Sequence, residues 1–203
     1  MREILKMIVV LALITGASGL LLAGVHEGTR EQRKKQILKY LKGPAVKEVL
    51  QGCTNNPLND VKEMPLGLGP GEETGAGIID IFPGYKDGKL WGVALEDSGQ
   101  GFGGNIDVIV GIDVENDKLL GIGVTTHKET PGLGARIKEE GFRGGFQEIA
   151  LNQEIAVGAD GGRIEAISGA TISSRGVCEA VNKAVAFYMK NKEKILAILE
   201  TKK

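Results

Sequence analysis

The chain has 203 residues, a size that fits one globular domain with additional segments. Charged residues make up 25% of the chain and the formal net charge is −1, so the composition offers no basic surface for nucleic acid. Two histidines and two cysteines, without Cys-x-x-Cys or His-x-x-x-His spacing, argue against a zinc or iron–sulfur site.

An uncharged stretch rich in Leu, Ile, Val and Ala runs from Met7 to Val25. As a helix it would cross most of the ~30 Å hydrocarbon core of a bilayer. A cleaved signal peptide is the alternative, but its apolar region would be shorter, and an Ala-x-Ala cleavage site is absent. We therefore predict a transmembrane anchor over residues 1–28.

Residues 29–75 are predicted to form a helical connector followed by a loop. Apolar residues recur at helical spacing between Glu31 and Leu50, with a separation into two pieces at Gly43-Pro44. The stretch from Gly52 to Gly75 contains three prolines and several glycines, which is typical of a connecting loop.

Four apolar runs follow in two pairs, and a short turn joins the members of each pair, which predicts two β-hairpins. Strands paired in this way form an antiparallel sheet. The 31 glycines are about twice the usual number and lie within apolar runs, which predicts turns and close backbone approaches. Asp160-Gly161 predicts a third hairpin. The paired runs are Ala76–Phe82 with Lys89–Leu95, Ile106–Val114 with Leu119–Thr126, and Ile155–Ala159 with Arg163–Ile167.

The last long pattern is helical, from about Arg175 to Glu200, with Ser173 or Ser174 as its N-cap.

The glycine-rich stretch 99–104 precedes a strand instead of a helix, which excludes a dinucleotide-binding fingerprint. Whether Cys53 and Cys178 pair stays open, because two cysteines imply no disulfide framework.

The stretch Ser168-Gly169-Ala170-Thr171-Ile172-Ser173-Ser174 joins the apolar run ending at Ile167 to this helix. A turn of small residues before a helix binds phosphate well, because free backbone N–H groups and the positive end of the helix dipole face it. Its four hydroxyls also offer oxygens that can be esterified. The alternative is an ordinary helix-capping turn.

A second informative stretch is Thr125-Thr126-His127-Lys128-Glu129-Thr130-Pro131-Gly132-Leu133-Gly134-Ala135-Arg136. Its proline fixes the chain, and its glycines permit unusual dihedral angles and a close approach to a flat ring. Leu133 is suited to lie against such a ring, and Thr130 to hydrogen-bond its polar edge. His127 and Glu129 are interpreted as residues that orient the loop or face partner subunits, not as an acid–base pair.

Both stretches resemble motifs of the FMN-binding domain family found in Rnf and Na⁺-translocating quinone reductase complexes. Residues 168–174 resemble the flavinylation motif S-G-A-T-x-[ST]-[ST], with Glu165 where the family usually has aspartate, and residues 125–136 resemble H-x-x-E-T-P-G-L-G. The resemblance implies FMN attached to Thr171 through a phosphoester, with no catalytic residue and no metal. The other cofactor-binding residues that it implies are Ser168, Gly169, Ala170, Ser173, Ser174, Glu129, Thr130, Gly132, Leu133 and Gly134.

The fold class that follows is α+β, with an N-terminal transmembrane helix and a single FMN-binding domain over residues 76–203, in which helices pack on a largely antiparallel sheet. The resemblance favours a membrane-anchored flavoprotein like the G subunit of Rnf complexes, which relays electrons between ferredoxin and NAD, coupled to Na⁺ or H⁺ translocation. The alternatives are the C subunit of a Na⁺-translocating NADH:quinone reductase, or a non-redox anchored module that binds a ligand or a protein.

The partners implied are other subunits of such a complex, membrane lipid, and a flavin transferase for maturation. The resemblance also implies that the FMN domain lies on the extracytoplasmic side. Lysine and arginine are more numerous after the apolar stretch than before it, which by the positive-inside rule favours the opposite orientation. We expect the extracytoplasmic side, because long domains translocate largely regardless of charge.

Overall fold

The computed structural model describes residues 1–65 and 78–200. The chain divides into two compact units, Met1–Tyr40 and Leu41–Lys203. The first unit contains helix α1 (Arg2–Gly28) and helix α2 (Arg30–Gln36), followed by the start of a π-helical turn, Ile37–Lys42. No residue of α1 is buried, and its length and composition suit a membrane span or a signal sequence, so the predicted N-terminal apolar helix is confirmed.

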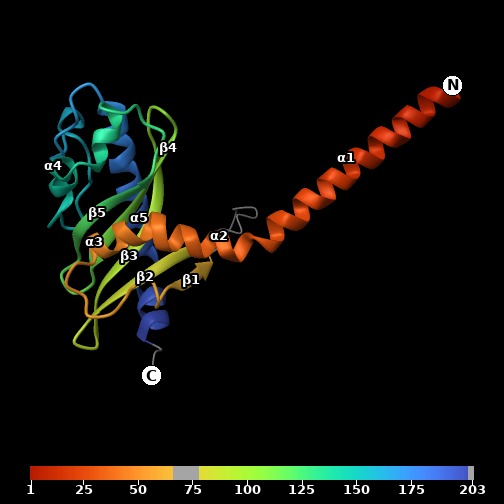
Figure 1. Ribbon diagram of the computed structural model, residues 1–203. Coiled ribbons are helices and arrows are strands. Elements are labelled where there is room, and N and C mark those ends of the chain that lie inside the picture. The colour runs from red at the N-terminus through yellow and green to blue at the C-terminus, as the bar shows by residue number, and fades with distance from the viewer. Residues whose placement is uncertain (66–77, 201–203) are drawn as a thin grey trace. The chain divides into compact units, whose positions relative to one another are not determined.

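The second unit is built on a five-stranded sheet with the order β1-β2-β3-β4-β5, antiparallel throughout (Figure 1). The predicted antiparallel sheet and both of its hairpins are confirmed. Residues 76 and 77, the first two of the first predicted strand, lie outside the described residues. The strands are β1 (Lys62–Pro65), β2 (Ile78–Lys86), β3 (Lys89–Gln100), β4 (Asn105–Asp113) and β5 (Lys118–Thr126).

Strand β1 corrects the sequence interpretation, which assigned this stretch to a loop. It adds to the edge of the sheet by pairing with β2, and Met64 is buried in the core. The preceding segment is held in place by Asn55, whose side chain accepts a hydrogen bond from Tyr85 N at 2.8 Å and donates one to Pro83 O at 3.0 Å. Such long-range contacts override the local prolines and glycines that favour a loop.

Helices cover both faces of the sheet: α3 (Gly43–Val49) lies on one face and α5 (Thr171–Glu200) on the other (Figure 1). Helix α3 begins at Gly43 with Pro44 in its first turn, where proline is tolerated. Under α3 the strands carry glycine: a Cβ at Gly111 would lie 2.9 Å from Val49 Cβ, and one at Gly123 2.7 Å from Ala45 Cβ.

The opposite face is still more closely packed. A Cβ at Gly99 of β3 would lie 1.9 Å from the carbonyl oxygen of Gly176 in α5. Because both partners are backbone, neither can move aside, and the first turns of α5 are fixed against β3. The expected close backbone approaches are therefore confirmed, and they explain the glycine content of the strands.

Between β5 and α5 the chain makes short helical turns whose apolar side chains close the core, including Ile137, Phe142 and Phe146. The hairpin predicted at Asp160-Gly161 is wrong. Residues 158–160 form a 3-10 turn, and Val157 and Ile164 form a single parallel bridge. The turns are Gly134–Lys138 (3-10), α4 (Glu140–Arg143), Gly144–Phe146 (3-10) and Gly158–Asp160 (3-10).

A polar cluster joins the start of α3 to the sheet. The Lys42 ammonium lies 3.0 Å from Asp80 Oδ2 and 2.8 Å from Glu96 Oε2, and the three side chains are only 13–21% exposed. Burial lowers the pKa of Lys42, but the hydrogen bonds and charges of Glu96 and Asp80 outweigh burial, so the pKa is raised. The lysine therefore stays charged and compensates two half-buried carboxylates.

We predict that Lys42→Met lowers the free energy of unfolding by about 2 kcal/mol, because two poorly solvated carboxylates lose their cation. Lys118→Met is the matched control, because its partner Glu148 is 73% exposed; its cost is expected to stay within about 0.5 kcal/mol. Denaturant unfolding of the purified variants measures both. Equal losses in the two variants would contradict a structural role for the Lys42 cluster.

Candidate functional site

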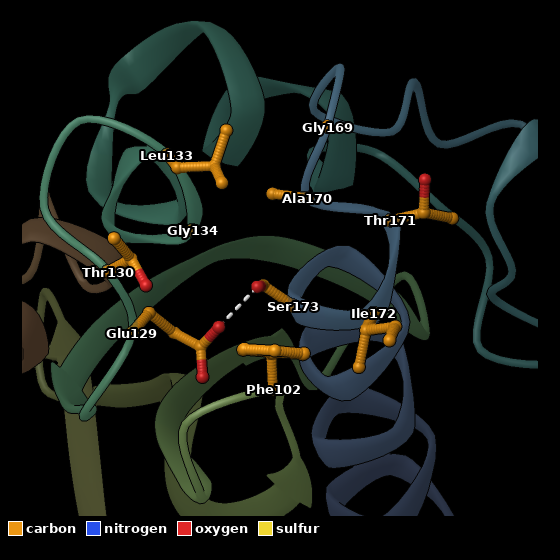
Figure 2. Close-up of a pocket in the computed structure, with 10 residues that line it drawn as sticks. All are labelled: Phe102, Glu129, Thr130, Leu133, Gly134, Gly169, Ala170, Thr171, Ile172 and Ser173. Atoms are coloured by element: carbon orange, nitrogen blue, oxygen red, sulfur yellow. Dashed lines mark hydrogen bonds between the residues drawn. The ribbon is translucent and has the colours of Figure 1, made fainter.

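A cavity of about 340 Å³ lies at the N-terminal end of α5 (Figure 2). Three segments that are distant in the chain form its walls: the loop between β3 and β4, the stretch after β5, and the turn that opens α5. The lining residues are Phe102, Glu129, Thr130, Leu133, Gly134, Gly169, Ala170, Thr171, Ile172 and Ser173.

The turn before α5 is set by glycine and serine. Gly169 adopts φ +78°, a left-handed conformation that side chains disfavour. The fully buried Ser174 hydroxyl accepts a hydrogen bond from Ile167 N at 3.0 Å and donates one to Ala170 O at 3.1 Å. The helix therefore begins at Thr171, four residues before the predicted start, and neither Ser173 nor Ser174 is its N-cap.

This start leaves hydrogen-bonding groups available on the cavity wall. The first helical bond in α5 runs from Ser174 N to Ala170 O, at 3.1 Å. Within the described ranges, the N–H groups of Thr171, Ile172 and Ser173 precede that bond and have no carbonyl partner in the helix. The dipole of a 30-residue helix adds positive potential at the same place. An anionic oxygen is the group that this end of the cavity favours.

Glu129 is the central polar residue of the site. It is 5% exposed, and both of its carboxylate oxygens accept hydrogen bonds. Oε1 accepts from Gly103 N at 2.7 Å, and Oε2 accepts from the Ser173 hydroxyl, as the dashed line in Figure 2 marks. One side chain thus joins the three segments that form the walls.

Glycines make room for this carboxylate. A Cβ at Gly134 would lie 2.7 Å from both Glu129 Oε2 and Ser173 Oγ, and a Cβ at Gly101 would lie 2.5 Å from Glu129 Oε1. Gly134 is therefore required for packing against the pair of side chains, and not for an unusual dihedral angle. At Gly132 the dihedral angle is the reason for glycine: its φ is +75°, and a Cβ there would meet no atom within 4 Å.

His127 supports the same loop. Its Nδ1 accepts a hydrogen bond from Glu129 N at 3.2 Å, which requires this nitrogen to be unprotonated. Burial and the positive charge of Lys138 lower the pKa of His127, against the smaller opposing effect of Glu129. The neutral ring therefore accepts a hydrogen bond that supports the conformation of this loop.

Apolar side chains surround the opening of the cavity. Phe102, Ile172 and Leu133 are 73%, 49% and 43% exposed, unusually high values for large apolar groups gathered in one place. Leu133 was predicted from the sequence, but Phe102 and Ile172 were not. A phenylalanine within a run of glycines is a usable signal, because a loop of glycines has no core of its own in which to bury the ring.

The structure brings together eight of the eleven residues named from the sequence. Three do not line the cavity: Ser168 is exposed, Gly132 lies outside it, and the Ser174 hydroxyl is buried beneath the turn. In the described part of the chain no cluster of His, Cys, Asp or Glu is arranged to hold a metal ion. The eight lining residues are Glu129, Thr130, Leu133, Gly134, Gly169, Ala170, Thr171 and Ser173.

Apolar surface for a flat ring, free N–H groups and a helix dipole for an anion, and glycine for close approach are the features that FMN requires. The residues present therefore fit this cofactor. Residues 101–186 match the family model described as the FMN-binding domain, a range that contains every residue lining the cavity. The fold and the site define a protein of the FMN-binding domain class.

Relatives narrow this class. The G subunit of the ion-translocating oxidoreductase complex of Methanosarcina acetivorans is 31% identical over 92% of this chain and 95% of its own length. The G subunit of the same kind of complex from Aliivibrio fischeri strain MJ11 is 31% identical over 95% of this chain and 94% of its own length. The chain belongs to the family of G subunits of ion-translocating oxidoreductase complexes.

A solved structure supports the architecture. The C subunit of the Na⁺-translocating NADH-quinone reductase from Parabacteroides distasonis superimposes with a TM-score of 0.58 over 79% of this chain and 94% of that protein. The two sequences are 22% identical, so the likeness establishes a shared fold.

We predict that Gly134→Ala lowers the free energy of unfolding by about 2 kcal/mol, because the added methyl group collides with Glu129 and Ser173 inside a packed wall. Gly141→Ala in α4 is the control, since a Cβ there meets no atom within 4 Å. Thermal unfolding of both variants measures the difference. A Gly134→Ala protein as stable as Gly141→Ala would show that the Glu129–Ser173 contact tolerates displacement.

Proposed function

We propose that the chain is a membrane-anchored flavoprotein subunit of an Rnf-type complex, relaying electrons between ferredoxin and NAD, coupled to Na⁺ or H⁺ translocation. Membership of the G-subunit family supports this assignment. A bound FMN would accept electrons from one carrier and pass them to the next. The chain's own residues would hold the cofactor and leave it accessible; the complete reaction requires the other subunits.

The observation that carries the proposal is the state of the hydroxyls around the start of α5. The Ser173 hydroxyl is engaged by Glu129, and the Ser174 hydroxyl by Ile167 and Ala170. Ser168 is exposed and does not line the cavity. Within the described ranges, Thr171 lines the cavity and its hydroxyl makes no hydrogen bond. It is the oxygen best placed for a phosphoester to FMN.

The proposed attachment also matches the local electrostatics. A phosphate joined to Thr171 would lie at the first residue of α5, where free N–H groups and the helix dipole stabilise negative charge. The flat ring would then meet the exposed apolar side chains of Phe102, Leu133 and Ile172. Thr130 and Glu129 would supply polar groups to the same wall.

The C subunit of a Na⁺-translocating NADH:quinone reductase is the less favoured alternative. The likeness to that protein is one of fold, at 22% identity, whereas the G-subunit relatives match at 31% over nearly their whole length. A non-redox module that binds an anionic ligand or a protein is the other alternative, and the attachment test separates it from the proposal.

We predict that Thr171→Val abolishes covalent flavin binding, because valine keeps the branched shape and removes the oxygen. The full-length chain is co-expressed with a flavin transferase, and flavin fluorescence is read at its band on a denaturing gel. The control is Thr54→Val, whose hydroxyl bonds Tyr85 O at 3.1 Å outside the cavity; its band should fluoresce like the wild type.

Two outcomes of this experiment count against the proposal. Fluorescence that persists in Thr171→Val means that another oxygen carries the flavin. A wild-type chain that stays colourless beside an active transferase argues for the non-redox module. Where the band is fluorescent, mass spectrometry of the peptides of the whole chain identifies the residue that carries the flavin.

We further propose that α1 is an uncleaved, single-pass anchor and that the FMN domain lies on the extracytoplasmic side. The 27 residues of α1 give a helix of about 40 Å, enough to span the hydrocarbon core with its interfaces. Lipid then surrounds a helix on which no residue is buried by protein. The other subunits and the flavin transferase would act on the exposed domain.

We predict that protease added to right-side-out spheroplasts digests the flavin domain, leaving only a short anchor fragment. A cytoplasmic marker protein, followed in the same samples, must remain intact until the cells are lysed. Digestion of the domain only after lysis would place it in the cytoplasm, as the excess of basic residues after α1 would favour.

A further inference from the structure

The least expected group in the cavity wall is the carboxylate of Glu129. An anionic cofactor site usually offers positive charge, yet the central polar side chain here is an acid with only 5% of its surface exposed. In the part of the chain that the structure describes, Glu129 forms no ion pair with a lysine or an arginine.

The hydrogen bonds of Glu129 suit its ionised form. Gly103 N–H and the Ser173 hydroxyl each point a donor at a different carboxylate oxygen. An ionised carboxylate only accepts, so it satisfies both donors. Donors of this kind stabilise a buried negative charge without removing it.

In the described part of the chain, no charged side chain on the elements around Glu129 forms an ion pair with its carboxylate. On its own loop, His127 has a pKa lowered by burial and by Lys138, so the ring is neutral there, and Lys128 is exposed. On the 3-10 turn 134–138, Lys138 is exposed, and the arginine on this turn and the one in the first turns of α5 are exposed and paired with other acids. These pairs are Arg136 with Glu139 and Arg175 with Asp160. The loop from Gly101 to Gly104 carries no charge.

We propose that the negative charge of Glu129 disfavours a reduced flavin ring that carries a net negative charge. Reduction by two electrons then takes up two protons, and the midpoint potential of the flavin is more negative than it would be without this charge. This inference rests on the proposed function. Two-electron reduction of FMN gives a neutral ring when two protons are added, and an anionic ring when only one is added. A fixed negative charge in a poorly solvated wall disfavours the second product. Glu129 acts through its charge and exchanges no proton with the flavin.

The test is a redox titration of the flavin bound to the detergent-solubilised, full-length chain, with dithionite as the electron donor. Glu129→Gln removes the charge and keeps the size of the side chain. We expect its midpoint potential to shift to a more positive value, and its dependence on pH to flatten toward one proton per two electrons. Glu129→Asp keeps the charge and is expected to retain the steep dependence on pH.

The matched control is Glu139→Gln, because Glu139 is 57% exposed, pairs with Arg136 and does not line the cavity. Its potential should equal that of the wild type. An unchanged potential and unchanged pH dependence in flavin-loaded Glu129→Gln would overturn the inference and leave the proposed function intact. A wild-type chain that binds no flavin would instead overturn the proposed function.

The wild-type protein gives a second measurement, which does not depend on whether the variant folds or takes up flavin. Its potential is titrated from neutral to alkaline pH beside free FMN in the same buffers. We expect the midpoint potential to fall with pH at the slope for two protons per two electrons, and this slope to extend to higher pH in the protein than in free FMN. A slope that falls to one proton at the same pH as free FMN, or earlier, would overturn the inference.

Discussion

The hydrogen bonds of one buried carboxylate hold the functional end of this protein together. Glu129 bonds to Gly103 and Ser173, which lie 26 and 44 positions away in the chain. A buried charge without donors is strongly unfavourable, so the loop after β3, the stretch after β5 and the start of α5 are coupled through it. The glycines at 101 and 134 follow from the same requirement, because any side chain there would occupy the space of the carboxylate.

Much of this site could be predicted from the sequence because its two main segments are local. Residues 129–134 and 169–173 carry their conformation in glycine, proline and small side chains, and their spacing is readable in the chain. Phe102 was missed because it joins the site only through the fold: the hydrogen bond from Gly103 to Glu129 brings its loop there. Strand β1 and the compact turn at 158–164 were misjudged for a similar reason. Their partners are distant residues, and composition alone indicated a loop and a hairpin.

The start of α5 shows how a shift of a few residues changes the chemistry. From the sequence, Ser173 or Ser174 was a reasonable helix cap, which would have left several hydroxyls equivalent. In the structure the helix begins at Thr171, and both serines lie within its first turn with their hydroxyls engaged. The sequence supplies four hydroxyls in seven residues; the position of the helix start distinguishes among them.

The openness of the cavity gives a physical reason for attaching a cofactor covalently. The proposed electron transfer to a partner requires the ring to be reachable, and the residues at the opening, Phe102, Ile172 and Leu133, are 73%, 49% and 43% exposed. An open site buries less of its ligand than an enclosed one, so its noncovalent affinity is limited. The proposed phosphoester at Thr171 removes this conflict, because retention then depends on a bond at one end of the cofactor while the other end stays exposed. The same bond allows a negatively charged side chain, Glu129, to line the cavity. A covalently attached cofactor is not lost when the charge of the protein disfavours its reduced form.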